Sequence, residues 1–227
     1  MKKALLGVLA IIVVCSSLAV AGEGTWSGFY FGLNAGLARH EPNWSDNGYD
    51  WFGGTLTNPY RTFLPGFAVG YNIQNGSVVF GFEADAAIGF TENVTDYSLD
   101  NWPNPGDYDV TKTDKLGFLA TLRGRVGFAV DNALFFMTVG AGIPSAAHTW
   151  IERNDAPDSW QTFHNSKLGM VLGLGFEHRL GQKFALRVEY LHFANYPVVE
   201  PNAQTHPYYM SVDEKVGILR LGFNILI

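Results

Sequence analysis

The chain has 227 residues, of which 47% are hydrophobic and 15% aromatic, and its 21 acidic side chains outnumber 15 basic ones, giving a formal net charge of −6. This acidic balance argues against nucleic acid as a partner. No stretch after residue 21 has about 18 consecutive apolar residues, which excludes membrane-spanning helices. The length fits one all-β domain, and no linker or low-complexity tract divides it.

The N-terminus has the pattern of a secretory signal peptide. Lys2 and Lys3 precede an apolar run over residues 4–14, and the small side chains of Ala19 and Ala21 suit a signal peptidase. We therefore predict cleavage after Ala21, so that residues 1–21 form the signal peptide and residues 22–227 form the mature barrel domain. The single cysteine, Cys15, lies in that leader, so the mature chain is expected to have no disulfide and no reactive thiol.

Alternating apolar and polar residues predict eight β-strands in the rest of the chain. They are residues 28–39, 63–72, 78–90, 115–129, 134–143, 168–179, 184–196 and 216–227. Three connections are tight, with turn formers such as Asn75-Gly76, and they alternate with four long, polar connections. The long connections are residues 40–62, 91–114, 144–167 and 197–215. This order predicts an eight-stranded antiparallel up-and-down transmembrane β-barrel with short periplasmic turns and long extracellular loops. A soluble sandwich or lipocalin-like barrel would not place its long connections so consistently at one end.

The positions of the charges indicate which face meets lipid, because Arg or Lys on the lipid face at the midplane costs about 2 to 4 kcal/mol. Eight charged side chains should therefore point into the lumen. They are Glu83, Asp85, Arg123, Arg125, Glu177, Arg187, Glu189 and Arg220. Equal numbers of acids and arginines favour a structural salt-bridge network, in which Arg123 and Arg125 pair with Glu83 and Asp85. The alternative is a gated ion path, which usually carries an excess of one sign.

The last strand carries its apolar face to the end of the chain, which predicts contact with lipid. Leu219, Leu221, Phe223, Ile225 and Ile227 lie on that face.

Three motifs resemble one known family. Residues 26–36 (WSGFYFGLNAG) resemble the opening strand of the Omp25/Omp31-like outer-membrane β-barrel proteins. Residues 122–128 (LRGRVGF) are similar to that family's Arg-Gly-Arg strand, and residues 186–191 (LRVEYL) are similar to its penultimate strand. The resemblance implies a porin-like, surface-exposed barrel in the outer membrane of a Gram-negative bacterium, with no catalytic residues to transfer. Ile227 stands where such proteins usually present an aromatic residue to the assembly machinery.

Lipid A-modifying barrels need a histidine, a serine and an acid near the outer leaflet. His192 lies at the right end of its strand, but Ala194 stands where the deacylases it faintly resembles have serine. Four histidines, His40, His148, His164 and His206, fall in predicted outer loops and are expected to be solvated. Asp114 belongs to an acidic segment that we expect to be hydrated, because no spacing there fixes metal ligands.

We therefore expect a structural, surface-exposed outer-membrane barrel with no catalytic residue, cofactor or metal. Its expected partners are outer-membrane lipids and lipopolysaccharide, the assembly machinery that binds the C-terminal strand, and a host or environmental ligand at the loops. One alternative is a small passive channel for ions or small solutes. A second alternative is a lipid A-modifying enzyme.

Overall fold

The computed structural model describes residues 25–47, 55–98, 109–153, 159–199 and 209–227. The predicted signal peptide, residues 1–21, lies outside the described residues. In the part of the chain that the structure describes, the regular elements are all β-strands. No helix long and apolar enough to cross a membrane occurs in these ranges.

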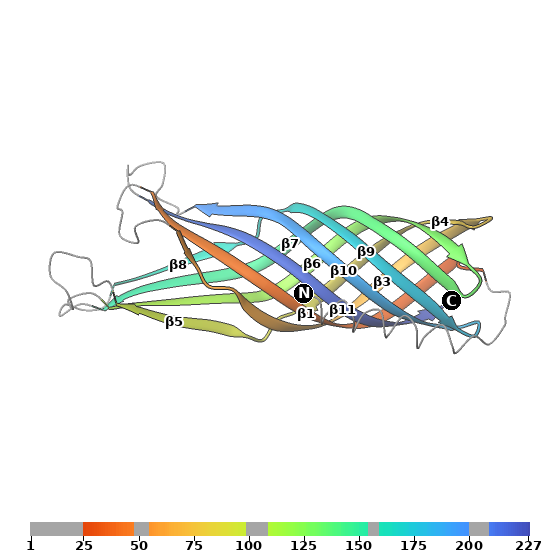
Figure 1. Cartoon of the computed structure of the whole chain (residues 1–227), viewed down its shortest axis with the longest axis horizontal. Helices are drawn as coiled ribbons and strands as arrows, with labels where there is room; N and C mark the ends of the chain where they lie inside the picture. The colour runs from red at the N-terminus through yellow and green to blue at the C-terminus, as the bar shows by residue number, and fades with distance from the viewer. Residues whose placement is uncertain (1–24, 48–54, 99–108, 154–158, 200–208) are drawn as a thin grey trace.

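Eight long antiparallel strands close into a barrel (Figure 1). They are β1 (Gly28–Asn47), β3 (Tyr60–Asn75), β4 (Val78–Ile88), β6 (Asp109–Val130), β7 (Ala133–Arg153), β9 (Gly169–Leu180), β10 (Phe184–Val199) and β11 (Tyr209–Leu226). Each pairs with the next in this order, and β11 pairs back with β1 to complete the ring. The prediction of an eight-stranded up-and-down barrel is therefore confirmed.

The three tight connections are turns at one end of the barrel, as predicted. Gly76 in the β3–β4 turn has φ of 59°, and Asp131 in the β6–β7 turn has φ of 50°. Backbone in this left-handed region is tolerated best by glycine and, next, by Asn and Asp. The turn residues therefore match the hairpins that they close.

At the other end, three short strands add to the wall. They are β2 (Thr55–Thr57), which pairs with β1, β5 (Glu92–Ser98), which pairs with β6, and β8 (Ser159–Asn165), which pairs with β7. Figure 1 shows β5 and β8 at the end of the barrel opposite the C-terminus. The prediction of four long polar loops is wrong for much of their length, because the long strands continue into those segments as paired β-structure.

The facing of the side chains explains why the sequence pattern missed these extensions. In the first part of β1, outward positions are apolar and exposed, as at Leu33 and Leu37. Beyond Leu37 the outward residues are Arg39 and Glu41, whereas Trp44 points inward and is fully buried. The apolar face thus changes from the outside of the wall to the inside. In this part of the barrel the outer surface faces water and the apolar side chains are buried inside, as in antiparallel sheets of water-soluble proteins.

The part of the wall nearest the tight turns presents large apolar side chains outward. Phe29 is 64% exposed and Leu122 65% exposed, while Arg123 and Arg125, which follow Leu122 along β6, are buried. This inside-out pattern fits a hydrocarbon environment. On β11 the outward face stays apolar to the last residue, as predicted, and the amide of Ile227 donates to the carbonyl of Phe29 at 2.8 Å.

Candidate functional site

The eight charged residues singled out in the sequence all lie inside the barrel, and none is more than 5% exposed. The carboxylates come from β4 (Glu83, Asp85), β9 (Glu177) and β10 (Glu189), and the guanidinium groups come from β6 (Arg123, Arg125), β10 (Arg187) and β11 (Arg220). We call this set the charged layer. Five of the eight long strands therefore contribute to one cluster of opposite charges.

Arg123 is the centre of the charged layer. Glu83 lies directly opposite it on the neighbouring strand, and the two side chains form an ion pair. The guanidinium also reaches Asp85 at 2.8 Å and, across the lumen, Glu189 at 2.6 Å. Thr138 accepts a further hydrogen bond at 2.9 Å. Arg123 thus ties β6 to β4, β7 and β10 at the same time.

Two more arginines connect the same carboxylates. Arg220 contacts Asp85 at 2.9 Å and Glu189 at 2.7 Å. Arg187 pairs with Glu83 and lies 2.9 Å from Glu189. Each of these acids therefore has at least two guanidinium partners, which is the arrangement that offsets the large cost of removing a charge from water.

Arg125 has a different partner from the one expected. It pairs with Glu177 at 3.0 Å, across the lumen on β9, and not with Glu83 or Asp85. Its second contact is the Tyr30 hydroxyl at 3.0 Å, which in turn donates to Glu83 at 2.5 Å. Tyr30 was missed in the sequence, although its inward position in the strand and its polar group are the signals that would have found it.

The ring of Phe136 supports two of the arginines. The guanidinium carbons of Arg125 and Arg187 lie 4.1 Å and 5.0 Å from its centroid, within the range of cation–π attraction. Gly175 makes room for this ring, because a Cβ there would lie 2.2 Å from the Phe136 Cζ. The aromatic ring fills space between the cations without adding a charge that needs a partner.

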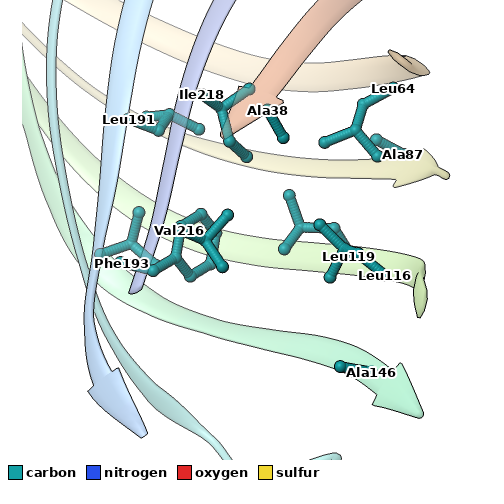
Figure 2. Close-up of a cluster of buried hydrophobic side chains, with 11 residues drawn as sticks. Ala38, Leu64, Ala87, Leu116, Leu119, Ala146, Leu191, Phe193, Val216 and Ile218 are labelled. Carbon is teal, nitrogen blue, oxygen red and sulfur yellow. The ribbon is translucent and has the colours of Figure 1, made fainter. Parts of the chain in front are cut away.

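Apolar layers lie on both sides of the charged layer. The upper apolar layer has a contribution from each of the eight long strands (Figure 2). Its members are Ala38, Leu64, Ala87, Leu116, Leu119, Ala146, Val171, Leu191, Phe193, Val216 and Ile218. The lower apolar layer, toward the tight turns, consists of Trp26, Val79, Ala129, Leu134, Phe136 and Ala185. Along β10 the inward order is Ala185, then Arg187 and Glu189, then Leu191 and Phe193, which gives the sequence of layers directly.

Above the upper apolar layer is a second buried polar cluster, which we call the outer polar cluster. His148 is its centre, with Nδ1 2.7 Å from Asp114 and Nε2 2.6 Å from Glu214. Glu214 also lies 3.2 Å from His40 Nε2, and His40 Nδ1 lies 2.8 Å from the Tyr60 hydroxyl. Both histidines and both carboxylates are fully buried. The expectation that His40 and His148 are solvated is therefore wrong, as is the expectation that Asp114 is hydrated.

Two further side chains complete the surroundings of Asp114. The Trp44 indole donates to it at 3.1 Å, and the Lys112 ammonium lies 3.3 Å from it. Lys112 also lies 5.0 Å from the Trp44 ring. The cluster thus joins β1, β3, β6, β7 and β11 in the part of the wall beyond the lipid-facing band.

The pKa values in the outer polar cluster follow from burial and pairing. Burial by itself lowers the pKa of His148, but its hydrogen bonds to Asp114 and Glu214 outweigh this and raise the pKa to about 9. Burial raises the pKa of Glu214, but the hydrogen bonds from His148 and His40 outweigh this and lower it to about 2. His148 is therefore a buried cation at neutral pH, held between two carboxylates.

Of the other candidate histidines, His164 is exposed and His206 lies outside the described residues. His192 points outward and is exposed, whereas its neighbour Phe193 is buried in the upper apolar layer. Among the described residues, no group of three or more His, Cys, Asp or Glu side chains is arranged to hold a metal ion. The interior groups that the structure describes neutralise one another and connect the strands of the wall.

A closed antiparallel barrel with apolar side chains facing outward and polar side chains facing inward belongs to the class of outer-membrane β-barrel proteins. The chain belongs to the family described as "Outer membrane protein beta-barrel domain", whose sequence profile matches residues 6–212. The 22 kDa outer membrane protein of Rhizobium leguminosarum bv. viciae is 26% identical over 203 residues, which are 89% of this chain and 80% of that protein. The 25 kDa outer-membrane immunogenic protein of Brucella abortus is 26% identical over 181 residues, 78% of this chain and 69% of that protein.

The resemblance to Omp25/Omp31-like proteins and the location in a Gram-negative outer membrane are thereby confirmed. These relatives are named as outer membrane proteins and not as enzymes. Among solved structures, Ail, the attachment invasion locus protein of Yersinia pestis, aligns with 88% of this chain and 99% of its own, with 13% identity and a TM-score of 0.40.

Proposed function

We propose that the protein is a closed structural barrel that holds its extended hairpins at the cell surface. The observation that carries this proposal is the layered filling of the lumen. The charged layer has four acids and four arginines, and an apolar layer covers it on each side. An ion moving along the barrel axis would have to cross both apolar layers without water, which is costly. The layers favour a sealed interior over a small passive channel.

In this proposal residues 1–21 direct export and are removed, and residues 22–227 form the mature barrel. The assembly machinery engages the C-terminal strand and inserts the barrel. The hairpins that include β2, β5 and β8 then face the exterior and contact host or environmental ligands. The name of the Brucella relatives, outer-membrane immunogenic proteins, supports exposure of this kind.

Planar-bilayer recording tests whether the lumen is closed. We expect no stepwise conductance from the wild-type protein in bilayers where a general porin, added as a positive control, gives clear steps. Phe193→Ser places a hydroxyl in the upper apolar layer and should begin to admit leak currents. Phe63→Ser makes the same change at an outward, half-exposed position and should leave the bilayer silent. Regular current steps from the wild type would favour the passive channel instead.

We propose no enzymatic role, because the outward His192 has Ala194 and not serine two residues further along. Mass spectrometry of lipid A from cells with and without the protein tests this point. The masses should be the same in both, and a protein-dependent loss or gain of an acyl chain would support the enzyme alternative.

A further inference from the structure

Two arginines face each other on the outer surface of the barrel, just beyond the lipid-facing band. Arg39 on β1 and Arg61 on β3 are directly opposite in the antiparallel ladder, and both are exposed. On the same faces, the next outward residues toward the tight turns are Leu37 and Phe63, which are 50% and 53% exposed. The arginine pair therefore lies at the boundary between an apolar surface and a polar one.

The chain neutralises only one member of this pair. Like charges directly opposite on neighbouring strands destabilise a sheet. Arg39 lies 2.7 Å from Glu41, but Arg61 forms no ion pair with any residue that the structure describes. Lys215, exposed on β11 opposite Glu41, adds a third cation beside the first two. Asp213, which is also outward, lies two residues further from the lipid-facing band.

The outward cation on β6, two strands from β3 around the ring, is different. Lys115 on β6 also faces outward beyond the apolar band, but it pairs with Glu92 at 2.5 Å. On the adjacent strands β3, β1 and β11, the three outward cations Arg39, Arg61 and Lys215 thus outnumber the outward acids Glu41 and Asp213. Such a local excess is notable in a chain whose net charge is −6.

A tyrosine and a shallow groove extend the same surface. Gly217 is opposite Arg39, and a Cβ on it would lie 2.6 Å from the Tyr190 hydroxyl, so this hydroxyl lies over the strand next to the arginine. Tyrosine commonly occupies the boundary of a membrane, where its ring meets lipid and its hydroxyl meets polar groups. Below the cations, Leu33, Ala35, Leu221 and Phe223 line a groove on the lipid-facing side of β1 and β11.

We propose that Arg39, Arg61 and Lys215 bind the phosphate of an outer-leaflet glycolipid, with an acyl chain lying along the groove between β1 and β11. A phosphate between the arginines would neutralise Arg61, which has no acidic partner among the described residues, and accept hydrogen bonds from both guanidinium groups. This inference rests on the proposed orientation, in which the extended hairpins face the exterior. It specifies the lipid partner and places it on one side of the barrel.

The test measures lipid binding to the full-length mature protein in detergent micelles. The probe is bis-phosphorylated lipid A, compared with the same lipid after removal of its phosphates and with inorganic phosphate at equal concentration. The readout is the lipid concentration that half-saturates the rise in thermal unfolding temperature. The variants are Arg39→Gln/Arg61→Gln, Arg61→Gln alone and, as the matched control, Lys115→Gln.

We expect the double variant to need at least about tenfold more lipid A than wild type, a change of about 1.4 kcal/mol, because it loses two charged donors to the phosphate. The half-saturating lipid A concentration of Arg61→Gln should lie between those of wild type and the double variant. That of Lys115→Gln should match wild type. Dephosphorylated lipid should bind all four proteins weakly, and inorganic phosphate should have no effect.

Equal half-saturation for the double variant and wild type would overturn the proposal, as would equal binding of phosphorylated and dephosphorylated lipid. Protection by inorganic phosphate at the same concentration would show an anion site that is not a lipid site. Arg61→Gln removes no ion pair with a described residue, so we expect it to fold. If the double variant does not fold, the comparison of Arg61→Gln with wild type still tests the proposal. A conducting wild-type barrel would contradict closure of the lumen without affecting this result, so the two failures are distinguishable.

Discussion

Glu83 and Arg123 lie directly opposite each other on β4 and β6, and their side chains form an ion pair with no exposed surface. Neither group can exchange its partner for water without moving the other side chains of the charged layer. The pair therefore couples the register of two neighbouring strands to the packing of the whole lumen. Its removal tests whether the charged layer stabilises the barrel.

Arg123→Met should lower the free energy of unfolding by about 3 to 5 kcal/mol, because it leaves Glu83, Asp85 and Glu189 with one fewer cation in a buried site. Glu83→Gln in the same chain should restore part of this loss, giving a coupling energy of about 1 to 3 kcal/mol in urea titrations. If the loss in the double variant equalled the sum of the two single losses, the two charges would be uncoupled. A water-filled lumen would then become the better description.

The contact between Arg125 and Glu177 predicts a second coupling, across the lumen. Arg125→Met and Glu177→Gln should show a larger coupling energy than Arg125→Met and Asp85→Asn, because Arg125 contacts Glu177 at 3.0 Å and makes no ion pair with Asp85. Double-mutant cycles on unfolding free energy measure both. Equal coupling in the two cycles would indicate that the charged layer acts through its total charge and not through specific pairs.

The raised pKa of His148 predicts a stability that falls in alkaline solution. The stabilisation from His148 should be complete below pH 6.5 and should be lost as the pH rises through about 9, because the carboxylates of Asp114 and Glu214 then face a neutral ring. The loss should amount to a few kcal/mol, since one pKa unit is about 1.4 kcal/mol. Lys112, His40 and Tyr60 are titratable groups that also face this cluster. The contribution of His148 is therefore isolated by comparing the pH dependence of wild type with that of His148→Gln.

Unfolding free energies between pH 6 and 10 provide the measurement, and His148→Gln should flatten the slope over this window. Glu214, whose pKa is lowered to about 2, contributes in the opposite sense. Its contribution should be present above pH 4.5 and lost as the pH falls toward 2. An unchanged alkaline slope in His148→Gln would show that other groups carry the pH dependence.

The parts of this architecture that follow from local rules could be predicted from the sequence. Period-two alternation and the cost of placing Arg in lipid are enough to turn Glu83 and Arg123 toward the lumen. The partner of Arg125 could not be predicted, because contact with Glu177 across the lumen depends on the stagger of all the intervening strands. His148 was missed for a different reason. Beyond the lipid-facing band the apolar face turns inward, so polar residues outside no longer indicate a loop.

Orientation gives the last prediction, because the proposed glycolipid site and the surface role both depend on it. The single cysteine, Cys15, lies in the predicted leader, so the mature chain should offer a thiol-free background. Thr57→Cys places one thiol at an exposed position in β2, and Ser77→Cys places one at an exposed position in the β3–β4 turn. A membrane-impermeant maleimide added to intact cells should label Thr57→Cys and leave Ser77→Cys unlabelled. After the outer membrane is permeabilised both should react, which controls for thiol reactivity. Labelling of Ser77→Cys alone in intact cells would show the opposite orientation, with Arg39 and Arg61 at the periplasmic leaflet.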